Sequence, residues 1–162
     1  MFLAEDCSHC NTMLKPILPE LISNLLPYGI IIDVIETADI LGEFGPWDIR
    51  RKLMKDLAYK VCGTPYIVIE YEDSKGEVKR RAILGTMANK EDYRAMILWE
   101  IILAILERYI PNPDARLGIA QRIWSRYFSD VERPDGTELY DVLSDVSKIL
   151  GKEGFRSSFL SF

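Results

Sequence analysis

The stretch that decides the expected fold reads Phe2-Leu3-Ala4-Glu5-Asp6-Cys7-Ser8-His9-Cys10. Its first three residues form an apolar run that is typical of a short β-strand. Asp6, Ser8 and Asn11 are residue types that cap helix N-termini, so we expect a helix to begin between Cys7 and Asn11. The pair of cysteines therefore stands where a strand gives way to a helix.

The residues after the cysteines continue the helical pattern and then change to a strand pattern. Apolar residues recur at three- and four-residue intervals from Met13 to Leu26, which predicts a helix with one apolar face. Pro16 and Pro19 predict a kink in this helix, because proline lacks a backbone donor and crowds the preceding turn. The β-branched run from Ile30 to Ile35 predicts a strand buried on both faces, as in a parallel sheet.

The middle of the chain predicts a helix, a hairpin and a second long helix. The turn sequence Asp73-Ser74-Lys75-Gly76 indicates that the two strands around it form an antiparallel hairpin. Asn89 caps the long helix in this prediction, with Asp92 three residues later. The four elements are expected at Trp47–Lys60, Tyr66–Tyr71, Val78–Leu84 and Asn89–Ile110. The predicted order is therefore β-α-β-α-β-β-α, an α/β fold.

The last part of the chain predicts a C-terminal helical extension, so the expected division is into residues 1–110 and 111–162. Pro111-Asn112-Pro113 breaks the preceding helix, and apolar stripes then predict two helices, within residues 117–128 and 139–150. Their apolar faces are expected to pack against the rest of the chain or against a second subunit in a homodimer. Trp99 and Trp124 stand in apolar helical stripes, so both are expected in the core.

The Cys7–Cys10 pair is the part of the sequence that carries chemistry. A sulfur at a helix N-terminus faces unpaired backbone N–H groups and the positive end of the helix dipole, which favour a thiolate. The spacing lets a disulfide form and reopen. We expect Cys7 to be the attacking thiolate and Cys10 to resolve the mixed disulfide. His9 stands between them and adds positive charge near Cys7.

On these residues the chain resembles the thioredoxin-like superfamily, over about residues 2 to 110. Three matching pieces occur in order: the strand, Cys-x-x-Cys and helix; Gly63-Thr64-Pro65 before the hairpin; and Ile83-Leu84-Gly85 before the long helix. The resemblance implies a central mixed sheet and a cis bond before Pro65. It also implies that the Thr64-Pro65 loop packs against the dithiol and pairs with the backbone of a client.

Within that superfamily the motif has its own pattern. Cys-x-His-Cys looks most like the disulfide-oxidising branch, in which the histidine helps to stabilise the reduced thiolate. Ser8 stands where Pro or Gly is common, so the redox direction is left open. Met1 stands where the thioredoxin branch has a buried acid, and the extra N-terminal strand and helix of thioredoxin are missing. The expected core is therefore minimal and similar to that of glutaredoxins.

The function that follows is a thiol–disulfide oxidoreductase without an organic cofactor, since the dithiol itself carries two electrons. The expected catalytic residues are Cys7, His9 and Cys10, and the expected client-binding residues are Ser8, Thr64 and Pro65. Cys62 is a candidate regulatory thiol, against the simpler interpretation of a small residue at a loop entrance. Two alternatives stay open. One is a non-catalytic binding or assembly module, and the other is a metal site built from Cys7, His9, Cys10 and Cys62.

Composition limits the partners and the compartment. The chain has 162 residues and a net charge of −5, which argues against an electrostatic nucleic-acid binder. Its most apolar stretch, Ala95 to Ile110, contains Glu100, Glu107 and Arg108 and is too short for a membrane span. No secretory signal is evident, so a cytoplasmic location is expected. The expected partners are proteins with disulfides or dithiols, together with a reductase or an oxidant.

Overall fold

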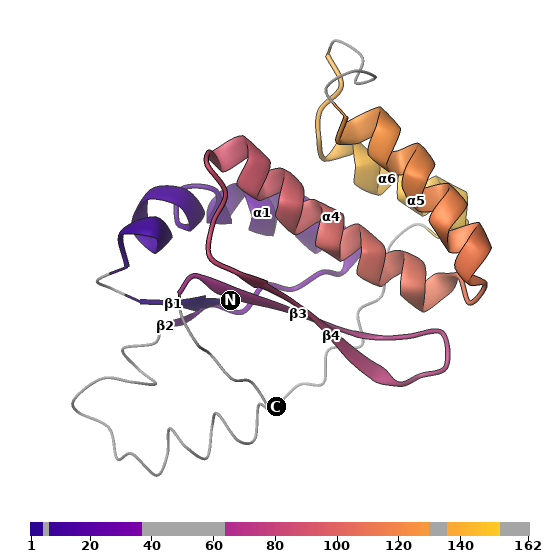
Figure 1. Ribbon diagram of the computed structural model, residues 1–162, viewed down its shortest axis with the longest axis horizontal. Coiled ribbons are helices and arrows are strands. Elements are labelled where there is room, and N and C mark those ends of the chain that lie inside the picture. Colours follow the sequence, from indigo (N-terminus) through magenta and orange to yellow (C-terminus); the bar gives the residue numbers. More distant parts are fainter. Residues whose placement is uncertain (5–6, 37–63, 130–135, 153–162) are drawn as a thin grey trace.

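The structure of the protein is a computed structural model, and it describes residues 1–4, 7–36, 64–129 and 136–152 (Figure 1). Within these ranges the chain is a mixed α/β structure with a four-stranded sheet in the order β2-β1-β3-β4. The strands are β1 (Phe2–Leu3), β2 (Ile35–Glu36), β3 (Tyr66–Glu72) and β4 (Val78–Leu84). β1 runs parallel to β2 and antiparallel to β3, and β3 runs antiparallel to β4.

Strand β2 corrects one prediction. A strand buried on both faces was expected from Ile30 to Ile35, but the strand covers Ile35–Glu36. Ile31 is 50% exposed and Val34 is 42% exposed. The physical reason is that β2 stands at the edge of the described sheet, and its neighbour β1 offers only Phe2 and Leu3 for pairing. Apolar composition alone therefore placed the start of this strand too early and overstated the burial of the residues before it.

The helix after the cysteines is interrupted, as its prolines predict. A π-helical turn spans Cys10–Leu14, and α1 (Leu18–Leu25) begins only after a break. Pro16 has no N–H for the carbonyl of Thr12, and the backbone instead closes a wider turn in which Lys15 N–H donates to Cys10 O at 2.8 Å. The prediction of a kinked helix is confirmed, and the break lies just beyond the two cysteines.

The hairpin is confirmed at its predicted place. β3 and β4 pair from Tyr66↔Leu84 to Glu72↔Val78. The turn between them is closed by Asp73, whose carboxylate accepts hydrogen bonds from the backbone N–H groups of Lys75 and Glu77. Gly76 has a φ of +80°, a left-handed conformation that favours glycine. The helix predicted for residues 47–60 lies outside the described residues.

Helix α4 (Lys90–Tyr109) lies with α1 over one face of the sheet (Figure 1). The predicted cap is confirmed, because the Asn89 side chain accepts a hydrogen bond from Asp92 N–H at 2.8 Å. The helix buries apolar side chains against β3, β4 and the π-helical turn, and Cys10 belongs to the same buried cluster. The buried residues of α4 are Tyr93, Ile97, Leu98, Ile101, Ile102, Ala104, Ile105 and Leu106.

The two C-terminal helices, α5 (Pro113–Tyr127) and α6 (Asp141–Leu150), lie beside α4 (Figure 1). The Asn112 side chain caps α5 by accepting from the backbone N–H groups of Asp114 and Ala115. The helices join the same apolar cluster as α4 through Ala120, Ile123, Tyr127, Val142, Leu143 and Val146. Their apolar faces therefore pack against the rest of their own chain, one of the two expected arrangements.

Trp99 and Trp124 differ in burial. Trp99 on α4 is half-buried, whereas Trp124 on α5 is 45% exposed, so the prediction that Trp124 belongs to the core is wrong. Trp124 packs edge-on against Trp99 and stacks on Phe128, with ring centroids 4.9 Å and 5.6 Å apart. The reason is that α5 turns Ala120, Ile123 and Tyr127 inward, which leaves the Trp124 side of the helix at the rim of the contact.

Candidate functional site

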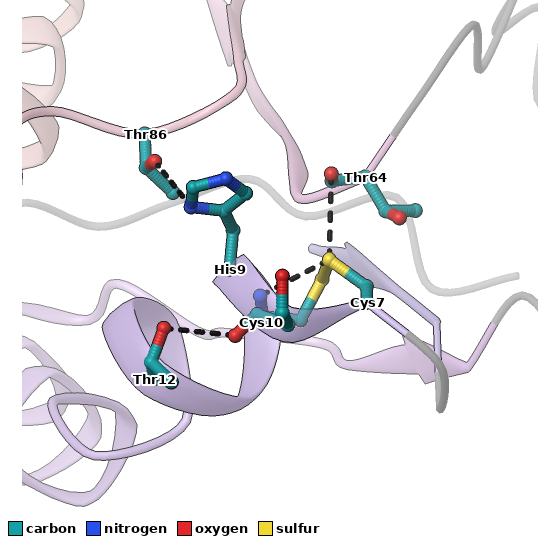
Figure 2. Close-up of a disulfide and its surroundings, with 7 residues drawn as sticks. Cys7, His9, Cys10, Thr12, Thr64 and Thr86 are labelled. Carbon is teal, nitrogen blue, oxygen red and sulfur yellow. Dashed lines mark hydrogen bonds between the residues drawn. A yellow bond between two sulfur atoms is a disulfide. The ribbon is translucent and has the colours of Figure 1, made fainter.

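Cys7 and Cys10 form a disulfide where β1 leads into the first helical turn (Figure 2). Their Cα atoms are 5.2 Å apart, and the turn is closed by a hydrogen bond from Asn11 N–H to the carbonyl of Cys7 at 3.1 Å. Cys10 is 0% exposed, whereas Cys7 is only half-buried. The pair is therefore asymmetric, and the sulfur that an outside molecule reaches first is that of Cys7.

Two backbone groups contact the Cys7 sulfur, and they have opposite effects on the stability of its thiolate form. The N–H of Cys10 donates to Cys7 Sγ at 3.0 Å, and in the reduced protein this donor stabilises a thiolate on Cys7. The carbonyl oxygen of Thr64 lies 3.4 Å from the same sulfur (Figure 2). A disulfide sulfur carries no proton, but a reduced Cys7 thiol can donate to this oxygen, which stabilises the neutral thiol. The balance of these two contacts sets the charge state of Cys7.

Cys10 has a different environment. It belongs to the apolar cluster with Leu14 and Tyr93, and burial of this kind disfavours a charged sulfur. Across the described ranges the buried polar or charged residue is Ser147, so none of those residues is a buried carboxylate that could take a proton from Cys10.

The loop that carries Thr64 is held by the sheet. The Thr64–Pro65 peptide bond is cis, the conformation that the resemblance implies, and Pro65 is buried. Gly85 N–H donates to the carbonyl of Pro65 at 3.0 Å, which extends the β3–β4 ladder by one bond. Gly85 has a φ of +82°, a left-handed conformation in which a side chain is strained. The segments before β3 and after β4 are thus tied together beside the dithiol.

His9 and Ser8, the two residues between the cysteines, lie at the surface. His9 is exposed, and its Nδ1 lies 3.3 Å from Thr86 Oγ1, so the ring is directed toward Thr86 (Figure 2). Ser8 is exposed as well, and its carbonyl accepts a hydrogen bond from Thr12 Oγ1 at 2.8 Å. Sequence reasoning missed Thr86. The available signal was its place directly after Gly85, in the last of the three matching pieces.

The structure brings together three of the residues predicted for the site, Cys7, Cys10 and Thr64, and Pro65 follows Thr64 in the chain. Cys62 lies outside the described residues, so its predicted regulatory role stays a prediction. Within the described part of the chain there is no group of three or more His, Cys, Asp or Glu side chains suited to hold a metal ion.

Comparison of the chain with protein-family models, curated proteins and solved structures finds no match. The site must therefore be interpreted from its own residues and geometry. Among the helices that the structure describes, none has both the length and the apolar character needed to cross a lipid bilayer.

Proposed function

We propose that this protein is a thiol–disulfide oxidoreductase with a thioredoxin-like fold. The observation that carries the proposal is the Cys7–Cys10 disulfide, whose accessible sulfur lies between the Cys10 N–H and the Thr64 carbonyl. The mixed sheet supports the proposed fold, because the dithiol follows β1 and the Thr64-Pro65 segment leads into β3. The half-buried Cys7 and the backbone donor at its sulfur support the proposed reactivity of this cysteine.

The proposed reaction is a pair of exchange steps. In the reducing direction the Cys7 thiolate attacks one sulfur of a client disulfide. The client S–S bond breaks, its second sulfur leaves as a thiolate, and a mixed disulfide forms between Cys7 and the client. Cys10 then passes its proton to solvent and attacks Cys7 Sγ as a thiolate. The S–S bond between Cys7 and the client breaks, the Cys7–Cys10 disulfide forms, and the client leaves as a dithiol once its two thiolates have taken up protons from solvent. Two electrons pass to the client, and the same steps in reverse oxidise a client.

The remaining residues are assigned to binding. The polar backbone of Thr64 faces the Cys7 sulfur, so a client chain that pairs with this segment presents its own sulfur to Cys7. Ser8 and Pro65, the neighbours of Cys7 and Thr64 in the chain, are assigned to client binding with Thr64, and His9 is assigned to tuning the Cys7 thiolate. A reductase or an oxidant, the partner that resets the dithiol, is part of the proposal, as is the cytoplasmic location expected from the sequence.

The test is the reduction potential of the Cys7–Cys10 pair, measured on the Cys62→Ser variant so that the thiol count reports on this pair alone. The metal-free protein is equilibrated in graded thiol/disulfide buffers, and free thiols are counted. We expect a reversible two-electron transition. A potential near about −270 mV indicates a reductant, and one near about −120 mV indicates an oxidant.

The matched control is the Cys10→Ser variant in the same background. It keeps Cys7 and the backbone N–H at position 10 but cannot close the disulfide. We expect at most one thiol per chain to disappear, as a mixed disulfide of Cys7 with the buffer thiol, in place of the two thiols that disappear together in the parent. If the parent shows no reversible transition in any buffer, the oxidoreductase proposal fails, and a binding or assembly module becomes the better interpretation.

A further inference from the structure

The contact between His9 and Thr86 joins two parts of the chain that are 77 positions apart. The Thr86 hydroxyl lies 3.3 Å from Nδ1 of the imidazole (Figure 2). Thr86 follows Gly85, whose N–H is bonded to the carbonyl of Pro65. The hydroxyl therefore lies on a backbone segment that the hydrogen bonds between β3 and β4 hold in place. It can restrain the exposed ring of His9.

The direction of the ring matters for the charge on sulfur. His9 stands between the two cysteines, and its side chain has rotamers that differ in which neighbour the imidazole approaches. In the disulfide form the ring is directed toward Thr86. On reduction a thiolate forms at Cys7, and an imidazole near it favours that anion. A hydroxyl that holds the ring at Thr86 limits its freedom to approach that anion, which weakens this effect.

We propose that Thr86 is a positioning residue that restrains the His9 imidazole and thereby limits how strongly His9 stabilises the reduced dithiol; this rests on the proposed function. The hydroxyl suits both states of the ring, because it donates to a neutral Nδ1 and accepts from a protonated one. Thr86 therefore lowers the tendency of the disulfide to oxidise its clients, without touching either sulfur.

The size of the effect follows from the exposure of the contact. An exposed hydrogen bond stands at the weak end of the range for proteins, which corresponds to about a threefold change in an equilibrium constant. Loss of the Thr86 hydroxyl should shift the redox equilibrium about threefold toward the reduced form. For a two-electron couple this is an increase of about 14 mV in the reduction potential.

The experiment compares Thr86→Val with Thr86→Ser, both in the Cys62→Ser background. Valine keeps the branched shape and removes the hydroxyl, whereas serine keeps the hydroxyl. We expect the threefold shift in Thr86→Val and the parent potential in Thr86→Ser. In a His9→Ala background the Thr86→Val substitution should have no effect, since the restrained ring is gone. A shift that persists without His9, a shift in the opposite direction, or no shift overturns the proposal.

A second readout separates this inference from the proposed function. His9 is the sole histidine of the chain, so the imidazole ¹⁵N signals of the untagged protein come from one ring. At alkaline pH, where imidazole is neutral, donation by Thr86 to Nδ1 places the ring proton on Nε2. Thr86→Val should change this tautomer balance in the oxidised protein, and Thr86→Ser should restore it.

The two readouts fail in different ways. Identical ring signals in the parent and Thr86→Val refute the Thr86 contact, whatever the redox result. Ring signals that change while the parent shows no reversible two-electron transition refute the proposed function, and with it the effect of Thr86 on the potential.

Discussion

The asymmetry of the two site cysteines leads to a prediction about which one reacts. In the reduced protein, Cys7 should be alkylated much faster than Cys10. Cys7 is half-buried and receives the Cys10 N–H at 3.0 Å, whereas Cys10 is 0% exposed. The variants to compare are Cys10→Ser and Cys7→Ser, both in the Cys62→Ser background, so that each protein has a single thiol. The donor is a backbone N–H, so Cys10→Ser leaves it in place.

The expected magnitude combines three contributions. A hydrogen bond to a charged acceptor contributes about 1.5–3 kcal/mol and favours the Cys7 thiolate. The Thr64 carbonyl opposes it, because a neutral hydrogen bond of about 0.5–1.5 kcal/mol favours the thiol. The difference of about 1 kcal/mol raises the thiolate population of Cys7 about fivefold. Cys10 is 0% exposed and must first be exposed by local opening, which should slow its reaction by at least about tenfold more.

The assay is the rate of alkylation by iodoacetamide at neutral pH, followed by mass spectrometry. The control is the same pair of variants in denaturing urea, where the two rates should become similar because the contacts are lost. Equal rates in the folded proteins, or a faster reaction at Cys10, would refute both the burial argument and the assignment of Cys7 as the attacking thiol.

Three predictions concern the scaffold. Leu143→Ala should lower the free energy of unfolding by about 2–5 kcal/mol, because Leu143 is fully buried in the cluster shared with α4; urea unfolding should show one transition, and two separate transitions contradict the shared core. Asn89→Ala should lower the free energy of unfolding by about 1 kcal/mol, because it removes the cap of α4. A urea-unfolding midpoint equal to that of the parent contradicts this prediction. The Tyr127 hydroxyl donates to Asp145 and holds the pKa of that carboxyl below its ordinary value of 3.8. This stabilisation is present above pH 3.8 and is lost as the pH falls through the lower folded pKa of Asp145. The free energy of unfolding of Tyr127→Phe should therefore fall less steeply than that of the parent as the pH is lowered through this range. An unchanged slope contradicts the assignment.

The sequence by itself determined the elements whose signals are local. The turn Asp73-Ser74-Lys75-Gly76 closes the hairpin with bonds from Lys75 and Glu77 to the Asp73 carboxylate, all within five residues. Asn89 and Asn112 cap the helices that follow them, and Gly151 ends α6 in a left-handed conformation. Such interactions join neighbours in the chain, so the residue types and their spacing are enough to predict them.

Burial was less predictable, because it depends on what covers a residue. Ile31 and Val34 have the composition of an interior strand, yet they flank an edge strand and are exposed. Trp124 has the spacing of a core residue, but the face of α5 that it occupies is at the rim of the contact with α4. Hydrophobic periodicity identifies a candidate inner face without saying which neighbour reaches it.

The candidate site also has one part that the sequence determined and one part that depends on the tertiary structure. The Cys7–Cys10 spacing and the helix start are local, and the sequence determined them. The approach of Thr64 to Cys7 was expected from the resemblance to a family, and its geometry comes from the pairing of β1 with β3. Only the tertiary structure showed that His9 turns to Thr86, because the two residues meet where the C-terminal ends of β1 and β4 lie at the same end of the sheet. Contacts of that kind depend on strand order, and no local pattern in the chain encodes it.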